Sequence, residues 1–573
     1  MAQKETENWV SRYAAGYHAW KTDQINGKKV YRRPLGLVEF SFDTDGTDYG
    51  GRADINALLT LEVRHALSEN EFSRRICLAW TNLRLQHTML MTRICENKET
   101  GKREFVVTVE GSKVDAIQEA TKTIVWVADH YTSVDGIELY RHCQNVARII
   151  DPASCLSHLF VLPPVQRSNG NFEVQFLIIM AHEISDGLTS YNWFSHFIRI
   201  LNTPVSIIEQ EIEIFGSAEN IASRLLPAQE DLYPPIAGSK ARQRWFWAIM
   251  RALRHVQKIP PQAFINPLLR TQRMPEPMSF PPTFSKLFDY SKENKPPMNS
   301  FHCVASLSKP ASSRLIQLCR SNNISVGAGC FALAGISMME IEEARRPNVP
   351  ASERRPFAAS FPLNPRTFFG WTSPADSCML AFSDGIVIPF LPSSLPVEGR
   401  FKLIARQANR QLRMYQKRLK SGEVNNTLDH HSPGRILANG YLYMFERVEA
   451  KLPAHRKTGI NPQGGYPAKM AQTKATCGVS SVGSTASYFR PGAYDLNDVG
   501  TVQGKDFAAD YRSLRMGVRA RENEFLAGSS TDANGIVGFG VSYDGNAISE
   551  ESAEAWAEKI KSLLEIKEDK AKL

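Results

Sequence analysis

One short segment of the chain combines a titratable imidazole with a carboxylate, directly after a strongly apolar run. Residues 172–181 have the composition of a buried strand, and His182, Asp186 and Gly187 follow it. A general base must be held firmly in place, and the end of a rigid strand provides such a position. Gly187 would allow a sharp turn and a backbone N–H near the histidine. The segment therefore predicts a proton-transfer site at His182.

The spacing alone also fits a histidine with a purely structural role. A second segment resembles the first: His130 and Asp135 precede Gly136, with one residue more between them. Two such segments in one chain show how easily the pattern arises. The interpretation of His182 therefore depends on the elements around it.

Composition excludes several classes of function. The 573 residues are 43% hydrophobic, with no apolar run of membrane-spanning length and a polar N-terminus unlike a secretory signal. The nine cysteines form no C-x-x-C pair, which argues against zinc ribbons and favours a reducing, cytoplasmic setting. The net charge of +9 is dispersed, so no nucleic-acid module is indicated. Such an excess suits solubility or a polyanionic small ligand such as a phosphorylated cofactor.

The first part of the chain is expected to alternate helices and strands. Residues 68–90 have a clear helical apolar face that begins near Ser68, and residues 37–42 alternate as a half-buried strand would. We expect a helical lead-in at 1–34, strands at 104–109 and 123–128, and helices at 135–148 and 188–202.

Residues 226–298 differ in character because they are rich in proline. Within them, residues 240–257 predict a basic helix that carries Trp245, Phe246 and Trp247. Such a helix could lie on a membrane or acidic surface. We expect instead that its aromatic face packs on the protein body and that its arginines face water.

The remainder repeats the strand–helix alternation, which predicts two α/β lobes that share a seam. We expect an N-terminal lobe at 1–225, a crossover at 226–298 and a C-terminal lobe at 299–573. Within the last, 420–475 and 485–530 are expected to be rich in loops. Strands are predicted at 301–307, 356–362, 384–390, 475–482 and 536–543, and helices at 310–321, 326–344, 397–418 and 549–565.

These features together resemble the coenzyme A-dependent acyltransferase superfamily, which includes chloramphenicol acetyltransferase, the plant BAHD enzymes and peptide-synthetase condensation domains. The family's H-x-x-x-D-G mark corresponds to His182–Gly187, and its N-x-R strand end to Asn364–Arg366. Other segments that resemble the family are 78–87, 479–483 and 538–546. The resemblance implies two chloramphenicol-acetyltransferase-like lobes, each a mixed sheet with flanking helices, with an active-site tunnel at the seam.

Two longer segments, 50–57 and 227–234, are most similar to fungal trichothecene 15-O-acetyltransferases and related alcohol acetyltransferases. One departure is the D-F-G-W-G sequence of the plant enzymes, of which Gly538–Gly540 is the nearest trace. Whatever that motif contributes to coenzyme binding must be achieved differently in this chain.

The resemblance also implies roles for individual residues. His182 would take the proton of an attacking alcohol, and Asp186 would pair with Arg366 to hold the motif loop. A triad role for Asp186 is the alternative. The Gly187 N–H and the hydroxyls of Ser480 or Ser481 would be donors to the oxyanion, although turn hydrogen bonds explain the serines equally well.

The function implied is transfer of an acetyl or other acyl group from acetyl-CoA, as co-substrate and without a metal, to a hydroxyl of a small metabolite. A sesquiterpenoid or polyketide alcohol would be the acceptor, and the enzyme would be a monomer. Two alternatives remain: a condensation-like enzyme that takes its acyl group from a carrier protein, and a repurposed cyclase or binding protein.

Overall fold

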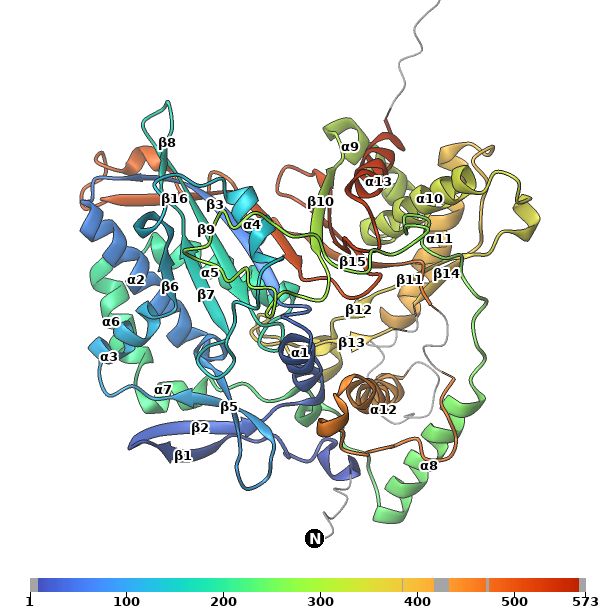
Figure 1. The fold of residues 1–573 in the computed structure, drawn as a ribbon, viewed down its shortest axis with the longest axis horizontal. Coiled ribbons are helices and arrows are strands. Elements are labelled where there is room, and N and C mark those ends of the chain that lie inside the picture. Colours follow the sequence, from blue (N-terminus) through green and yellow to red (C-terminus); the bar gives the residue numbers. More distant parts are fainter. Residues whose placement is uncertain (1–8, 384, 417–431, 470–473, 566–573) are drawn as a thin grey trace, which may run out of the picture.

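The computed structural model describes residues 9–383, 385–416, 432–469 and 474–565. Two large sheets with flanking helices lie side by side, and a smaller four-stranded sheet lies at one end of the first (Figure 1). The architecture is therefore mixed α/β with two lobes, as the sequence predicts.

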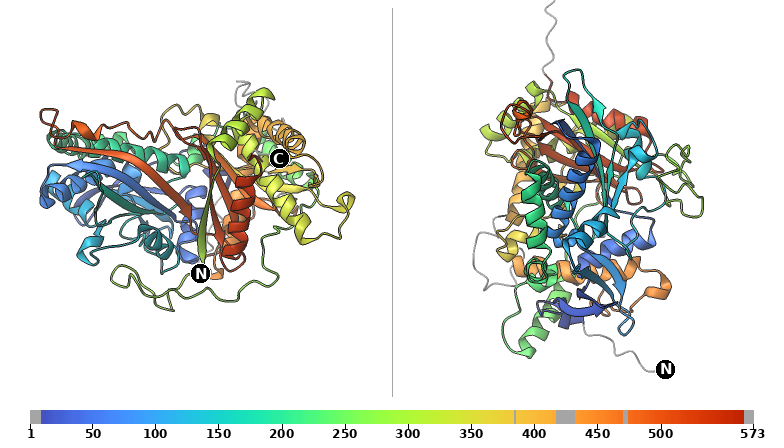
Figure 2. Two further views of the ribbon diagram at one scale, coloured as in Figure 1. Left: turned by 90° about the horizontal axis from the view of Figure 1, so that it is seen from above. Right: turned by 90° about the vertical axis from the view of Figure 1, so that its left-hand side faces the viewer.

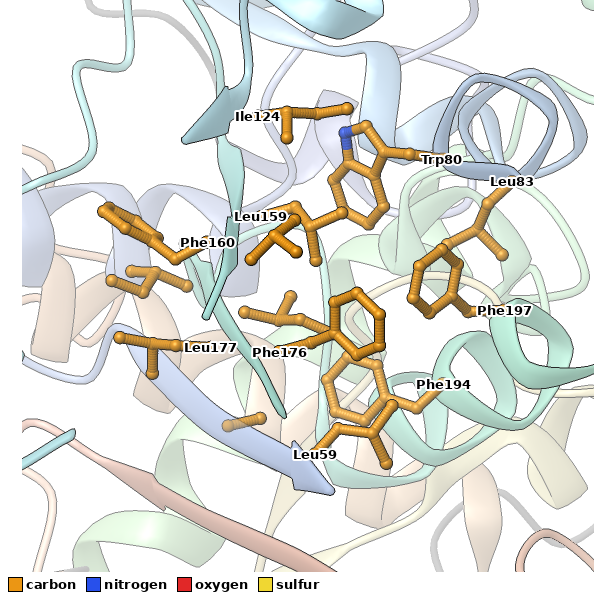
Figure 3. Close-up of a cluster of buried hydrophobic side chains, with 14 of the residues drawn as sticks. Leu59, Trp80, Leu83, Ile124, Leu159, Phe160, Phe176, Leu177, Phe194 and Phe197 are labelled. Carbon is orange, nitrogen blue, oxygen red and sulfur yellow. The ribbon is translucent and has the colours of Figure 1, made fainter. Parts of the chain in front are cut away.

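The first large sheet contains the strand that leads to the histidine. Its strand order is β16-β3-β9-β7-β6, with β8 paired to β9. Strand β9 is buried from Phe176 to Met180, which explains its continuous apolar sequence. Trp80 of α2 and Phe197 of α5 pack edge to face beside Phe176 (Figure 3). The elements are β3 (Ile55–His65), α2 (Glu69–Gln86), α3 (Lys113–Thr121), β6 (Ile124–Trp126), α4 (Gly136–Cys143), β7 (Ser157–Val161), β8 (Val165–Gln166), β9 (Phe172–Met180), α5 (Gly187–Leu201), α6 (Val205–Phe215) and α7 (Ala218–Ser223).

The second large sheet has the order β10-β18-β17-β15-β11-β14 and is mixed, because β15 runs parallel to both β17 and β11. Buried side chains of its helices pack around Trp556 and Phe357. The elements are β10 (Ser300–Ser306), α9 (Lys309–Ser321), α10 (Val326–Arg345), β11 (Phe357–Ser360), β14 (Ile386–Ile388), α11 (Val397–Gln416), β15 (Cys477–Ser484), β17 (Phe525–Thr531), β18 (Val537–Asp544) and α13 (Glu550–Ser562).

A third layer joins the two lobes. Helix α1 (Leu37–Asp48) packs against α12 (Pro433–Lys451), which also contacts α8 (Lys240–Val256). Tyr13, Trp247 and Tyr441 form an aromatic cluster among them. The small sheets consist of β1 (Lys21–Ile25), β2 (Lys28–Pro34), β4 (Arg93–Glu96) and β5 (Arg103–Thr108), and of β12 (Pro362–Leu363) with β13 (Ala381–Phe382).

One long strand, β16 (Phe507–Val518), links the second half of the chain to the first sheet. It pairs antiparallel with β3 along its whole length, from Phe507 opposite His65 to Val518 opposite Ile55. Figure 2 (left) shows this strand in orange beside the blue strand β3. The edge of the first sheet is thus built by residues far away in the sequence.

Several expectations about elements are wrong. Residues 37–42 are helical, and residues 21–34 form strands rather than part of a helical lead-in. The alternation at 37–42 misleads because α1 is buried on several sides, including its acidic residues Glu39, Asp43 and Asp45. The segments 420–475 and 485–530, which we expect to be rich in loops, contain α12, β16 and β17. The predicted helical residues 417–418, strand residue 384 and residues 1–8 lie outside the described residues.

Within the described ranges, no single helix has the length and apolar character to cross a membrane. Helices α9 and α10 reach that length and composition only together, across a bend of 116°.

Candidate functional site

His182 lies two residues after the end of β9, and Phe42 of α1 covers one face of its ring. The imidazole stacks on Phe42 with ring centroids 3.8 Å apart and planes 2° from parallel. Met180 is fixed opposite Ile55 in the ladder between β9 and β3. A firmly paired strand and a stacked ring therefore restrict both the position and the tilt of the imidazole.

The surroundings of His182 keep its ring neutral. Burial disfavours the imidazolium and lowers the pKa of His182 to about 4, and the guanidinium of Arg521 acts in the same direction. A hydrogen bond to its own backbone carbonyl and the carboxylates of Asp186 and Asp45 oppose the shift but are outweighed. Nδ1 lies 3.9 Å from Sγ of Cys378. At neutral pH the ring can accept a proton, and its Nδ1 edge faces protein.

Asp186 forms a buried ion pair, and within the described residues the hydrogen bonds of its carboxylate go to Arg366, Met379 and Thr189 rather than to the imidazole of His182. Its Oδ2 accepts a hydrogen bond from Nη2 of Arg366 at 2.6 Å and one from the Met379 N–H at 3.0 Å. Its Oδ1 accepts from the Thr189 N–H at 3.0 Å, which makes Asp186 the N-cap of α5. Both charged side chains are about 5% exposed. The structure thus brings Asp186 and Arg366 together, and the contacts of this carboxylate are those of a scaffold.

Arg366 also anchors the loop 375–379, which carries Cys378. Its guanidinium donates to the carbonyl of Ser377 at 2.5 Å, and Thr189 donates to the same oxygen at 2.9 Å. Asp376 accepts hydrogen bonds from Trp193 of α5 and from Nδ1 of His87, both at 2.5 Å. The loop is therefore tied to the first lobe at nearly every residue, which fixes the thiol beside the histidine.

The remaining predicted site residues are arranged differently. Gly187 is the first residue of α5. A Cβ atom at this position would contact only Cε of Met516, at 3.9 Å, and the backbone is not left-handed. Neither crowding nor backbone conformation therefore requires glycine at this position. Ser480 and Ser481 lie on β15, where Ser529 donates to the Ser480 carbonyl. Among the described residues, neither serine hydroxyl forms a hydrogen bond with His182. Their predicted oxyanion role thus has no support from these contacts.

The sequence interpretation missed a charged group beside the histidine. Asp45 of α1 is fully buried and pairs with Arg52, with Lys451 at 2.5 Å and with Arg521 at 3.2 Å. The guanidinium carbon of Arg521 lies 5.7 Å from the ring centroid of Phe42. Arg521 and His182 therefore share Phe42 as a neighbour. Glu524 also pairs with Arg521, and burial lowers the pKa of Lys451 to about 7, so this group carries little net positive charge at neutral pH.

Glu183, next to the histidine, is a second titratable group that the sequence did not single out. It is fully buried, and neither carboxyl oxygen has a hydrogen-bond partner among the described residues. Nη2 of Arg148 lies 3.8 Å from Oε1 of Glu183. This guanidinium already forms a bidentate ion pair with Asp54. Burial therefore dominates and raises the pKa of Glu183 to about 8, so the carboxyl is protonated at neutral pH.

Replacing Glu183 with glutamine tests this protonation state. The folded chain holds a proton that the unfolded chain releases above its ordinary pKa of 4.5, so native stability falls between that pH and about 8. Glu183→Gln stays neutral and should remove this loss. The stability of the variant relative to the unaltered chain should therefore rise by on the order of 4 kcal/mol between pH 4.5 and alkaline pH. Urea unfolding across this pH range measures it, and identical pH dependence of both proteins would contradict it.

Comparisons with known proteins rest on structure alone. No family model matches this chain, and no curated protein matches it by sequence. The TRI3 trichothecene 15-O-acetyltransferase from Fusarium sporotrichioides superimposes with a TM-score of 0.66 at 11% identity, over 96% of this chain and 97% of that one. The condensation domain of the monacolin K polyketide synthase MokA gives 0.50 at 12% identity, over 93% and 96%.

These identities are too low to carry function, but both matches span nearly the whole of each chain. The agreement therefore covers both lobes and the layer that joins them. This chain therefore shares its two-lobed fold with an O-acetyltransferase and with a condensation domain.

Proposed function

We propose that this protein is an acyl-CoA-dependent O-acyltransferase that moves an acetyl group to the hydroxyl of a small metabolite. The observation that carries the proposal is the imidazole of His182, held against Phe42 near a strand end while Asp186 is committed to Arg366. A neutral, positioned imidazole is the form that a general base requires. The match to an O-acetyltransferase over nearly the whole chain supports the same class of reaction.

In the proposed reaction, Nε2 of His182 takes the proton of the alcohol as its oxygen attacks the thioester carbonyl. The new C–O bond forms, the carbonyl π electrons move onto its oxygen, and the C–S bond then breaks. The imidazolium returns the proton to the leaving thiolate, so the enzyme ends unchanged. With Nδ1 directed at protein and the backbone, Nε2 is the nitrogen available to substrate.

Two features support stabilisation of the negative charge in this reaction. The Gly187 N–H belongs to the first turn of α5, whose donors cannot be satisfied within the helix, and the helix dipole favours an anion there. Arg521, which pairs with Asp45 and Glu524, lies beside Phe42 as a second candidate donor. Such donors can contribute about 3–4 kcal/mol each to transition-state stabilisation. Ser480 and Ser481 remain proposed donors.

The pH dependence of the rate follows from the lowered pKa of His182. Activity requires the neutral ring, so kcat/KM should stay level through neutral pH and fall only as the pH approaches about 4. The protein must stay folded near pH 4 during this measurement. Activity is therefore measured in short assays that follow a jump from neutral to acidic pH. A fall in kcat/KM centred near pH 6.5, the ordinary pKa of histidine, would contradict the lowered pKa of His182.

The choice of acyl donor separates this proposal from its alternatives. The fold is shared with a condensation domain, so a carrier-protein donor is the second candidate. The protein is incubated with hydroxylated sesquiterpenoids and polyketide alcohols, and with either acetyl-CoA or an acetylated carrier protein. Ester formation from free acetyl-CoA supports the proposal, and ester formation from the carrier alone supports the second candidate. Binding of the alcohols without any ester would indicate a repurposed, non-transferase protein.

A further inference from the structure

Helix α8 presents two different faces. Its inner face packs Phe246, Trp247 and Met250 against the third layer, as expected from the sequence. Its outer face carries a second apolar stripe, at residues spaced three and four apart: Trp245, Ile249, Ala252 and Val256. Trp245 and Val256 are each 66% exposed. An isolated exposed apolar residue is ordinary, whereas a stripe along a helix marks a contact surface.

Basic residues flank this stripe on both sides. Arg242 lies on one side of it, and Arg244 and Arg251 lie on the other, at helical spacings. From residue 232 to residue 275 the chain contains eight lysines and arginines and no acidic residue. The neighbouring residues 450–469 contain four more and again no acid. The rest of the chain contains 56 lysines and arginines and 59 acidic residues. The positive net charge of the protein therefore comes from these two segments.

The segment that runs beside α8 continues the surface. Gln463 donates to the Arg251 carbonyl at 2.8 Å, and the Lys469 N–H donates to the Arg254 carbonyl at 3.1 Å. Tyr466, 67% exposed, lies edge-on to His255. Between this segment and α8 lies a hollow of about 320 Å³ lined by Ala252, Val256 and Tyr466, among others. In Figure 1, α8 lies at the outer edge of the molecule, away from both large sheets.

We propose that the outer face of α8, with residues 463–466, is a docking surface for an anionic phospholipid membrane. An exposed tryptophan and aliphatic side chains flanked by arginines have the composition of a helix that lies at a lipid–water boundary. Lys451, Arg456, Arg254 and Arg273 are paired with carboxylates of other segments. The exposed Arg242 and Arg244 beside the stripe are complementary to anionic headgroups. The buried anchor of Arg254, which binds Glu446 and Gln463, holds the helix so that this stripe faces outward.

Vesicle sedimentation of the full chain tests this surface. The protein should sediment with vesicles of phosphatidylcholine and phosphatidylserine, and much less with phosphatidylcholine alone, and added salt should weaken the binding. The double change Arg242→Gln and Arg244→Gln should weaken binding about 30-fold, at about 1 kcal/mol for each arginine. Trp245→Ala should weaken it about tenfold.

Two matched controls separate this surface from general charge and apolar exposure. Arg406→Gln with Arg410→Gln removes the same charge from exposed positions on α11, and Val114→Ser removes an exposed apolar residue from α3. Both should bind vesicles as the unaltered chain does. Absence of phosphatidylserine-dependent sedimentation, or equal binding by the α8 variants, would overturn the proposal. So would self-association, or binding to an acidic carrier protein but not to vesicles, that Trp245→Ala abolishes.

Discussion

Replacing His182 with alanine is expected to lower acetyl transfer by roughly 100- to 10,000-fold while the protein still folds. The ring supplies the only neutral base proposed for the alcohol proton. Alanine would remove the stacking of the ring on Phe42, which belongs to the hydrophobic cluster of the third layer rather than to the core of either lobe. Steady-state kcat/KM with acetyl-CoA and urea unfolding of the same preparation measure the two effects separately.

His130 provides a matched control for this experiment. It belongs to the segment that resembles the motif in sequence, but the structure places it on an exposed turn before α4. His130→Ala should therefore retain both activity and stability. Substantial remaining turnover in His182→Ala would contradict the general-base role, whatever the behaviour of the control.

Replacing Asp186 with alanine is expected to destabilise the protein by about 3–5 kcal/mol, because Arg366 would be left as a buried charge without its carboxylate partner. The change also removes the N-cap of α5 and the acceptor of the Met379 N–H. Soluble yield and the midpoint of urea unfolding should both fall. Activity should fall too, because the loop that carries Cys378 loses its anchor.

Asp135 shows what the loss of a cap alone would cost. It precedes Gly136 at the start of α4, just as Asp186 precedes Gly187, but it only caps the helix. Asp135→Ala should cost about 1 kcal/mol. The double variant Asp186→Leu with Arg366→Met should recover part of the stability lost in Asp186→Ala, because no unpaired charge is left. If Asp186→Ala instead kept full stability and lost only turnover, the triad interpretation would be preferred.

The sequence predicts those helices and strands whose buried residues follow a simple periodic pattern. Helix α2 is an example: one face is apolar, and Ser68 and Glu71 form the capping box that starts it. Strand β9 is recognisable because both of its faces are covered near its end. The pairing of Asp186 with Arg366 was expected only from family resemblance, since spacing alone does not bring residues 180 positions apart together.

The missed features depend on contacts between distant parts of the chain. Helix α1 buries acidic residues because Arg103, Arg52 and Lys451 neutralise them, and no local pattern shows those partners. Once α1 is taken for a strand, Phe42 cannot be placed against His182. Strand β16 pairs with β3 across more than 400 residues, which hides it in a region that resembles loops. Arg521 follows that strand and was missed with it.

The central claim is that His182 removes the alcohol proton in a direct transfer. A single-turnover experiment with labelled acetyl-CoA and an accepted alcohol tests it, with the label divided after quenching between protein, coenzyme and alcohol. The account predicts that the label passes from coenzyme to alcohol without appearing on the protein, and that His182→Ala leaves it on the coenzyme. Label trapped on the protein, for example on Cys378 beside the imidazole, or undiminished transfer without His182, would contradict it.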